Sequence, residues 1–153
     1  MVVIAIMALI TSFVLPYIPA DKSDRMREDS DRFEALIAYA QTDAILQSRD
    51  LGMVVDGSNY SFLQQGTEGW ETIEEEPLNS QSVESYLTQT LYIEDEEFVD
   101  NTFSDDLVPS ILFFSSGEIS PFEYKLALSE QQFVRLTYNL LGDVEREYVD
   151  ETQ

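Results

Sequence analysis

Carboxylates are the most abundant side chains in this chain that could do chemistry. The 153 residues include 30 Asp and Glu against 8 Lys and Arg, which gives a formal net charge of −22. Two carboxylates can hydrolyse a glycosidic bond, and several together can bind Ca²⁺. With so many acids, some pair will lie within reach of one another by chance. A carboxylate pair is therefore no evidence for a catalytic site here.

The remaining side chains exclude most enzyme mechanisms. The sequence has no His and no Cys, so it offers no Ser-His or Cys-His nucleophile, no thiolate or imidazole zinc site and no disulfide. Gly52 and Gly57 have the separation of a phosphate-binding loop, but Ser58 and Asn59 follow where a lysine is required. We predict that the chain is not an enzyme and has no catalytic residue, cofactor or metal ion.

The acidic residues are concentrated in the middle of the chain, where residues 50–123 contain 17 acids and no basic residue. Such a surface excludes nucleic acid as a partner and disfavours anionic membranes. The densest runs, Glu74–Glu76 and Glu94–Glu97, are expected to form solvated, mobile loops. A calcium site is the weaker alternative, because no Asp-x-Asp-x-Asp-Gly pattern occurs and Asp105 and Asp106 lack a following glycine.

The chain opens with a long uncharged run. Residues Met1–Leu15 carry no charge and precede Pro16, which is expected to kink or break a helix. A helix of that length spans roughly 22 Å, short of the ~30 Å hydrocarbon core of a bilayer. We interpret the run as a membrane helix that lacks its beginning. A secretory signal cut near Ala20 and a buried core helix are the alternatives, although no basic residue precedes the run as a signal would require.

An amphipathic helix is predicted for residues 21–49, continuing the first segment. Apolar residues recur there at the spacing of one helix face, which indicates a stripe packed on a domain. Its basic residues are expected to lie on a solvated face with partners four residues away, such as Arg25 with Asp29. The predicted buried stripe consists of Phe33, Leu36, Ile37, Ala40 and Ala44.

The apolar period changes to two after Gly52, which predicts a mostly antiparallel β domain and an α+β fold for the whole chain. Asp56-Gly57 is a strong turn signal between strands at 53–55 and 60–64. Trp70 begins the next strand and is expected to be a core residue. Further strands are predicted from 70–73, within 83–93, and at 111–114, 122–128, 133–141 and 144–149.

The opening of the chain resembles the N-terminal helix of type IV pilins and type II secretion pseudopilins, starting partway along it. In that family the mature helix begins Phe-Thr-Leu-Ile-Glu-Leu, and those residues have no counterpart here. Six more residues would give an apolar run of about 21, enough for one membrane crossing. The resemblance implies that Pro16 is the family's helix kink. It also implies a membrane-spanning and filament-core helix of Met1, Val2, Val3, Ile4, Ala5, Ile6, Met7, Ala8, Leu9, Ile10, Phe13, Val14 and Leu15.

Later segments resemble one family of minor pseudopilins, called protein H of the type II secretion system. The similar segments are 40–49 at the end of the helix, a Gly-Trp pair in the early strands, and an apolar strand that leads into a Ser-Gly turn. The acidic loops 74–82 and 94–106 are then variable insertions. The positions that match the family's motifs are Gly69, Trp70, Phe113, Phe114, Ser115, Ser116, Gly117, Pro121 and Phe122.

The resemblance implies a structural role in a bacterial secretion filament. Residues 1–20 would form a single transmembrane or filament-core segment in the inner membrane, 21–49 the rest of the stalk, and 50–153 a periplasmic β domain. Implied partners are the other minor pseudopilins, the major pseudopilin, the inner-membrane assembly platform and exported proteins. Two alternatives stay open at this point: a minor pilin that primes type IV pili, and a free periplasmic ligand-binding domain.

Overall fold

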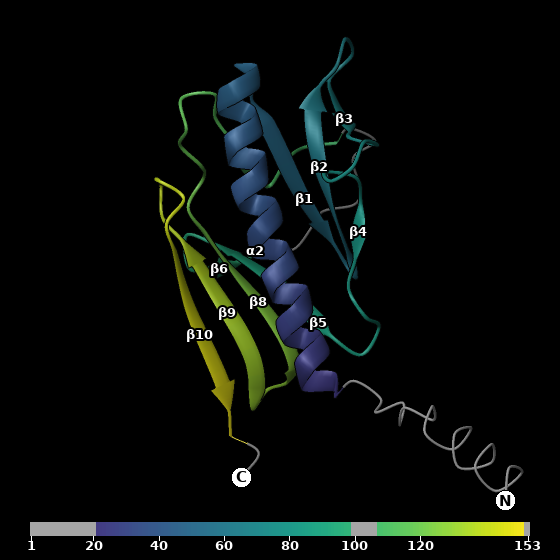
Figure 1. The fold of residues 1–153 in the computed structure, drawn as a ribbon, viewed down its shortest axis with the longest axis vertical. Coiled ribbons are helices and arrows are strands. Elements are labelled where there is room, and N and C mark those ends of the chain that lie inside the picture. The colour runs from purple at the N-terminus through teal and green to yellow at the C-terminus, as the bar shows by residue number, and fades with distance from the viewer. Residues whose placement is uncertain (1–20, 99–106, 152–153) are drawn as a thin grey trace, which may run out of the picture.

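The computed structural model describes residues 21–98 and 107–151, in which one long helix lies along two antiparallel β-sheets (Figure 1). The predicted α+β class is confirmed. The first sheet has the order β3 (Trp70–Thr72), β2 (Asn59–Gln65), β1 (Leu51–Asp56), β7 (Ile111–Phe113), with β4 (Gln81–Ser82) also pairing with β2. The second sheet has the order β10 (Val144–Asp150), β9 (Gln132–Tyr138), β8 (Phe122–Ser129), β5 (Thr88–Ile93), β6 (Glu96–Glu97).

Helix α2 (Lys22–Gln47) confirms the predicted amphipathic segment and most of its bounds. Asp21 caps the first turn by accepting a hydrogen bond from the backbone N–H of Ser23, and Ser48 ends the helix in the left-handed conformation. All five residues of the predicted stripe are buried. The expected Arg25–Asp29 pair is wrong, because Arg25 binds Glu28 and Asp29 binds Arg32 instead.

The predicted strands are confirmed in position, except that the strand expected at 133–141 ends at Tyr138, and the first hairpin forms where its turn signal predicts. Strands β1 and β2 pair antiparallel from Leu51 opposite Gln64 to Asp56 opposite Asn59. Gly57 occupies the turn with a φ of 54°, a conformation that glycine adopts without strain. The side chains therefore alternate between the two faces of the sheet as the sequence predicts.

The two acidic loops contain more structure than expected. Glu74–Glu76 are exposed, as predicted, but Leu78 behind them is only 3% exposed, and β4 follows it. Glu94 and Asp95 form a tight turn with positive φ between β5 and β6. One buried leucine and two short strand pairings thus fix segments that composition alone describes as loops.

Phe33 is the side chain through which the helix contacts both sheets. Its ring stacks on Tyr124 of β8, with centroids 3.8 Å apart and planes 5° apart. On the other side it meets the edge of Tyr60 of β2 at 5.2 Å. Burial raises the pKa of Tyr60 to about 12, which keeps the phenol neutral in this core. Phe33 itself is 0% exposed.

The predictions for the N-terminal segment fall outside the described residues. These are the apolar run Met1–Leu15, the kink at Pro16 and the segment 1–20. Within the part of the chain that the structure describes, no helix is both long and apolar enough to cross a bilayer.

We predict that Phe33→Ala lowers the free energy of unfolding by about 3–5 kcal/mol, because it leaves a cavity where helix and both sheets meet. Urea denaturation followed by circular dichroism measures the change. Tyr39→Ala is the matched control, since this aromatic residue lies on the same helix but is 47% exposed. Equal losses in the two variants would contradict the central position of Phe33.

Candidate assembly surface

The segment of β7 and its following turn contains most of the predicted motif positions, and the structure brings them to the end of the helix. Phe113 is 0% exposed and pairs with Ile119 across the turn. Gly117 closes the turn with a φ of 98°, which disfavours any other residue. The ends of β7 and of the turn are thus fixed by one buried ring and one glycine.

Contacts from outside the turn hold it in place. The backbone N–H of Ser115 donates to Oδ1 of Asp50 at 2.8 Å, which ties the turn to the start of β1. Ser116 and Pro121 are exposed, whereas Phe122 is buried and stacks on Tyr138 with centroids 4.6 Å apart. Of these motif positions, Ser115, Ser116 and Pro121 remain accessible to a partner.

Gln41 joins three segments that are far apart in the sequence. Its Nε2 donates to the carbonyl oxygen of Gly117 at 2.6 Å and to that of Leu141 at 2.9 Å. The second contact requires Gly142, since a Cβ there would lie 2.5 Å from the Gln41 amide. Sequence reasoning missed this residue as a fastening point, although it lies within the segment 40–49 that carries the resemblance.

Three segments therefore form one surface, which we call the distal surface: the helix end 41–47, the turn 114–118 and the turn 139–143 (Figure 1). Apolar side chains project from it into solvent. Ile45 is 47% exposed and lies against Gly117, and Leu141 is 69% exposed. Exposed apolar side chains that gather at one place are typical of contact surfaces.

Gly69 and Trp70 lie elsewhere, on the outer face of the first sheet. Trp70 is half-buried rather than a core residue, so that expectation is corrected. Its ring and Pro109 lie over Gly52, where a Cβ would be 2.5 Å from the Cβ of Pro109. Gly52 thus allows Pro109 and Trp70 to lie close to the backbone of β1. Trp70 also lines a hollow of about 340 Å³ with Arg49, Asp50, Gln64 and Gln65.

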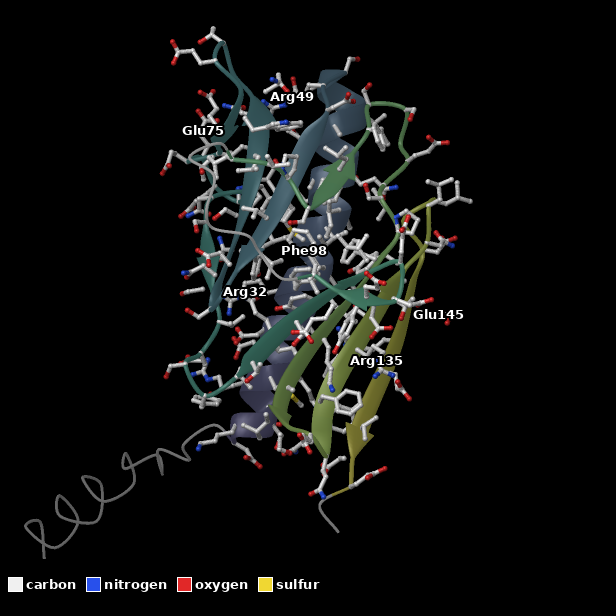
Figure 2. The ribbon with its side chains drawn as sticks, turned by 180° about the vertical axis from the view of Figure 1, so that it is seen from behind. Arg32, Arg49, Glu75, Phe98, Arg135 and Glu145 are labelled. Carbon is white, nitrogen blue, oxygen red and sulfur yellow. The ribbon has the colours of Figure 1, made fainter. Side chains whose placement is uncertain are left out.

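Every one of the eight basic residues is engaged within the chain itself. Arg146 of β10 binds Asp31 at 2.6 Å and Glu34 at 3.0 Å, both on α2. Arg135 binds Glu123 and Glu147 on the outer face of the second sheet (Figure 2). Arg25, Arg32 and Arg49 have carboxylate partners, while Lys22, Arg27 and Lys125 lie over aromatic rings. The surface that remains for partners is acidic.

One acidic residue of α2 is buried. Asp29 is 6% exposed, and burial raises its pKa above the ordinary value of 3.8, against the opposing effects of Arg32 and the backbone N–H of Glu84. Asp29 and Arg32 form an ion pair three residues apart on α2.

In the part of the chain that the structure describes, one long helix lies along an antiparallel β domain, which is the architecture of a pilin-like protein. The chain belongs to the family described as type II transport protein GspH, whose sequence profile matches residues 29–142. The match includes most of α2 and both sheets up to the turn between β9 and β10. No match to an individual curated protein was found for the chain.

Solved structures agree with this assignment at the level of the fold. The minor pseudopilin EpsH from the type II secretion system of Vibrio cholerae superposes with a TM-score of 0.71 at 20% identity, covering 87% of this chain and 100% of that one. GspH of E. coli superposes with a TM-score of 0.66 at 18% identity, covering 90% and 98%. The type IV minor pilin FimU of Pseudomonas aeruginosa gives a TM-score of 0.55 at 15% identity, covering 81% and 89%.

We predict that Gln41→Glu lowers the free energy of unfolding by about 1–3 kcal/mol, because the carboxylate keeps the size of the side chain but cannot donate to the two carbonyls. Thermal or urea denaturation measures the loss. Gln47→Glu, at the exposed end of the same helix, makes the same change of charge and should cost little. If the two variants lose the same stability, the amide does not fasten the distal surface.

We predict a second effect from the raised pKa of Asp29. The folded state binds this proton more tightly than the unfolded state, so the carboxyl favours folding most below the unfolded pKa, and this contribution falls as pH rises through the folded pKa. The free energy of unfolding of Asp29→Asn should therefore fall less than that of the wild type between pH about 4 and about 7.

Urea titrations across this pH range test the prediction. Glu75→Gln is the control, because it makes the same neutralising change at an exposed acid between β3 and β4 (Figure 2). Parallel profiles for Asp29→Asn and the wild type would refute the raised pKa.

Proposed function

We propose that the chain is a minor pseudopilin of the type II secretion system, a structural subunit at or near the tip of the periplasmic pseudopilus that helps to export folded proteins across the outer membrane. The observation that carries the proposal is the family match over residues 29–142. A subunit of this kind works by position and contact. It requires no catalytic residue, cofactor or metal ion of its own.

The proposal places the segment 1–20 in the bacterial inner membrane as a single-pass anchor, with the β domain in the periplasm. The uncharged run Met1–Leu15 supports it, because a helix that is apolar all round suits both lipid and the packed centre of a filament. The net charge of −22 supports projection of the β domain into water.

The distal surface is the proposed contact with neighbouring subunits. Its exposed Ile45 and Leu141 supply apolar area, and Gln41 holds the three contributing segments in a fixed arrangement. The proposed partners are the other minor pseudopilins and the major pseudopilin. The inner-membrane assembly platform and exported proteins are further proposed partners.

A minor pilin of a type IV pilus is the second candidate. The structural likeness to FimU favours it, with a TM-score of 0.55. The likenesses to EpsH and GspH are greater, with TM-scores of 0.71 and 0.66, and therefore favour the secretion filament.

Deletion of the gene should cause secreted proteins to accumulate in folded form in the periplasm, and the wild-type chain should restore their export. We predict that Leu141→Glu restores export less well, because it places a charge among the exposed apolar side chains of the distal surface. Val108→Glu is the matched control, since Val108 is 66% exposed and Leu141 is 69% exposed.

Immunoblots of culture medium and periplasm measure export, and the level of each variant is measured in the same cells. Normal export together with loss of surface pili after deletion would favour the type IV pilus instead. Equal export by the two variants would remove the distal surface from the contact.

A further inference from the structure

Strand β10 (Val144–Asp150) forms one edge of the second sheet. It pairs with β9 along its whole length, from Val144 opposite Tyr138 to Asp150 opposite Gln132, without a bulge. Long regular edges without a bulge or proline can pair with another strand. The other side of β10 faces no strand among the described residues (Figure 1).

The pattern of hydrogen bonds between β9 and β10 shows which backbone groups of β10 point toward β9 and which point away from it. The N–H of Glu151 donates to the carbonyl of Gln131, and the N–H of Asn139 donates to that of Asp143. In an antiparallel ladder, hydrogen-bonded pairs of residues alternate with pairs that are not hydrogen-bonded. Counting in from these two ends, the backbone groups of Glu145, Glu147 and Val149 hydrogen-bond to β9.

The intervening residues therefore direct their backbone groups away from the sheet. These are Val144, Arg146 and Tyr148, and no described residue hydrogen-bonds to their N–H or C=O groups. The free edge thus presents donors and acceptors at the spacing that an added strand requires.

A groove of about 450 Å³ lies between this strand and the helix. Ala35 and Ala38 of α2 line it opposite Val144 and Arg146 of β10. Small side chains on the helix leave the room, while Arg146 holds the two walls together through Asp31 and Glu34. Side chains of a strand added beside β10 would enter this groove from its open side.

The buried hydroxyl of Tyr138 belongs to the residue opposite Val144, which lines the groove. Tyr138 pairs with Val144 in the ladder and is 3% exposed, yet its hydroxyl has no hydrogen-bond partner in the described part of the chain. This hydroxyl interacts electrostatically with Glu34 and Arg146, two of the residues that line the groove. A buried hydroxyl without a partner is unusual in a folded protein.

Charge decides which occupant fits. Glu145 is exposed, and Glu147 shares its ion-pair partner Arg135 with Glu123. The outer face of β10 is therefore acidic. A second copy is disfavoured, because antiparallel pairing of β10 with itself about its central residue would set Glu147 against Glu147 between two chains of net charge −22. The partner must instead bring cations, since this chain has none to spare.

We propose that β10 and the groove beside it bind an extended, basic segment of a neighbouring filament subunit as an additional strand of the second sheet. The segment carries small apolar side chains on the face toward Ala35 and Ala38, and Lys or Arg on the face toward Glu145 and Glu147. Its source in the filament rests on the proposed function, whereas its binding is a property of this chain alone.

The first test uses the full 153-residue chain in nonionic detergent and a ten-residue peptide of alternating valine and lysine. Amide hydrogen exchange is followed by NMR. The N–H groups of Arg146 and Tyr148 should exchange at least about tenfold more slowly with the peptide, while those of Glu145 and Glu147 are already protected by β9. A peptide of alternating valine and glutamate is the control and should have no effect.

The second test separates local pairing from general attraction of a basic peptide. Glu145→Lys and Glu75→Lys change the net charge equally, but Glu145 lies on β10 and Glu75 lies by the other sheet (Figure 2). Glu145→Lys should weaken binding about tenfold and Glu75→Lys less than about threefold. Equal weakening, or binding without slower exchange at Arg146 and Tyr148, would overturn the proposal.

Two further outcomes also decide. Slower exchange at Arg146 and Tyr148 that rises with protein concentration in the absence of peptide would show self-association at β10 and overturn the proposal. If the chain restores export after gene deletion but the peptide does not slow amide exchange, the strand-addition proposal is refuted and the proposed function stands. A chain that binds the peptide as expected but has no role in export refutes only the proposed function.

Discussion

The structure depends on the burial of one helix face between two sheets that do not pair with one another. Phe33 stacks on Tyr124 of the second sheet and meets Tyr60 of the first, so a single ring links both. Without the helix, each sheet would expose an apolar face, since most of the buried apolar residues of β1, β2, β8 and β9 belong to one cluster with α2. The hydrophobic effect therefore couples the two sheets to the helix, because neither sheet is shielded from water without it.

Charge imposes the second constraint. A chain of net charge −22 destabilises its own compact state by repulsion, and its few cations are placed where they oppose this most directly. Arg146 neutralises two acids of the helix from the edge strand, and Arg135 neutralises Glu123 and Glu147 on neighbouring strands. Because these cations pair with acids of the same chain, recognition of a partner depends on the other groups at the surface. The surface offers carboxylates, exposed apolar side chains and the free edge of β10, and each of these selects a partner of complementary chemistry.

The sequence predicts the local structure well because its signals are local. Apolar spacing locates α2, and Asp56-Gly57 locates the turn of the first hairpin. Long-range relations carry no such signal. Gln41 reaches carbonyls 76 and 100 residues further along the chain, and nothing in its neighbours distinguishes it from any helical glutamine. Leu63 alternates to the outer face of its sheet yet is 0% exposed, because Trp70 and Pro109 lie over Gly52 beside it. The family resemblance located the motif segments, but the geometry was needed to divide them between a turn, a core and an outer face.

Contacts at the start, middle and far end of the helix fasten it to the β domain. Helix α2 has 26 residues and is about 39 Å long. Near its start, Ser23 accepts a hydrogen bond from Gln132 of β9 and Arg27 lies 4.3 Å from the ring of Tyr148 on β10. Phe33 holds the middle and Gln41 holds the far end. A force along the helix axis is thus borne at the same time by several contacts between the helix and the β domain. Such contacts must break together rather than one after another, so the β domain moves with its helix as one body. The proposed role in a growing filament requires this property.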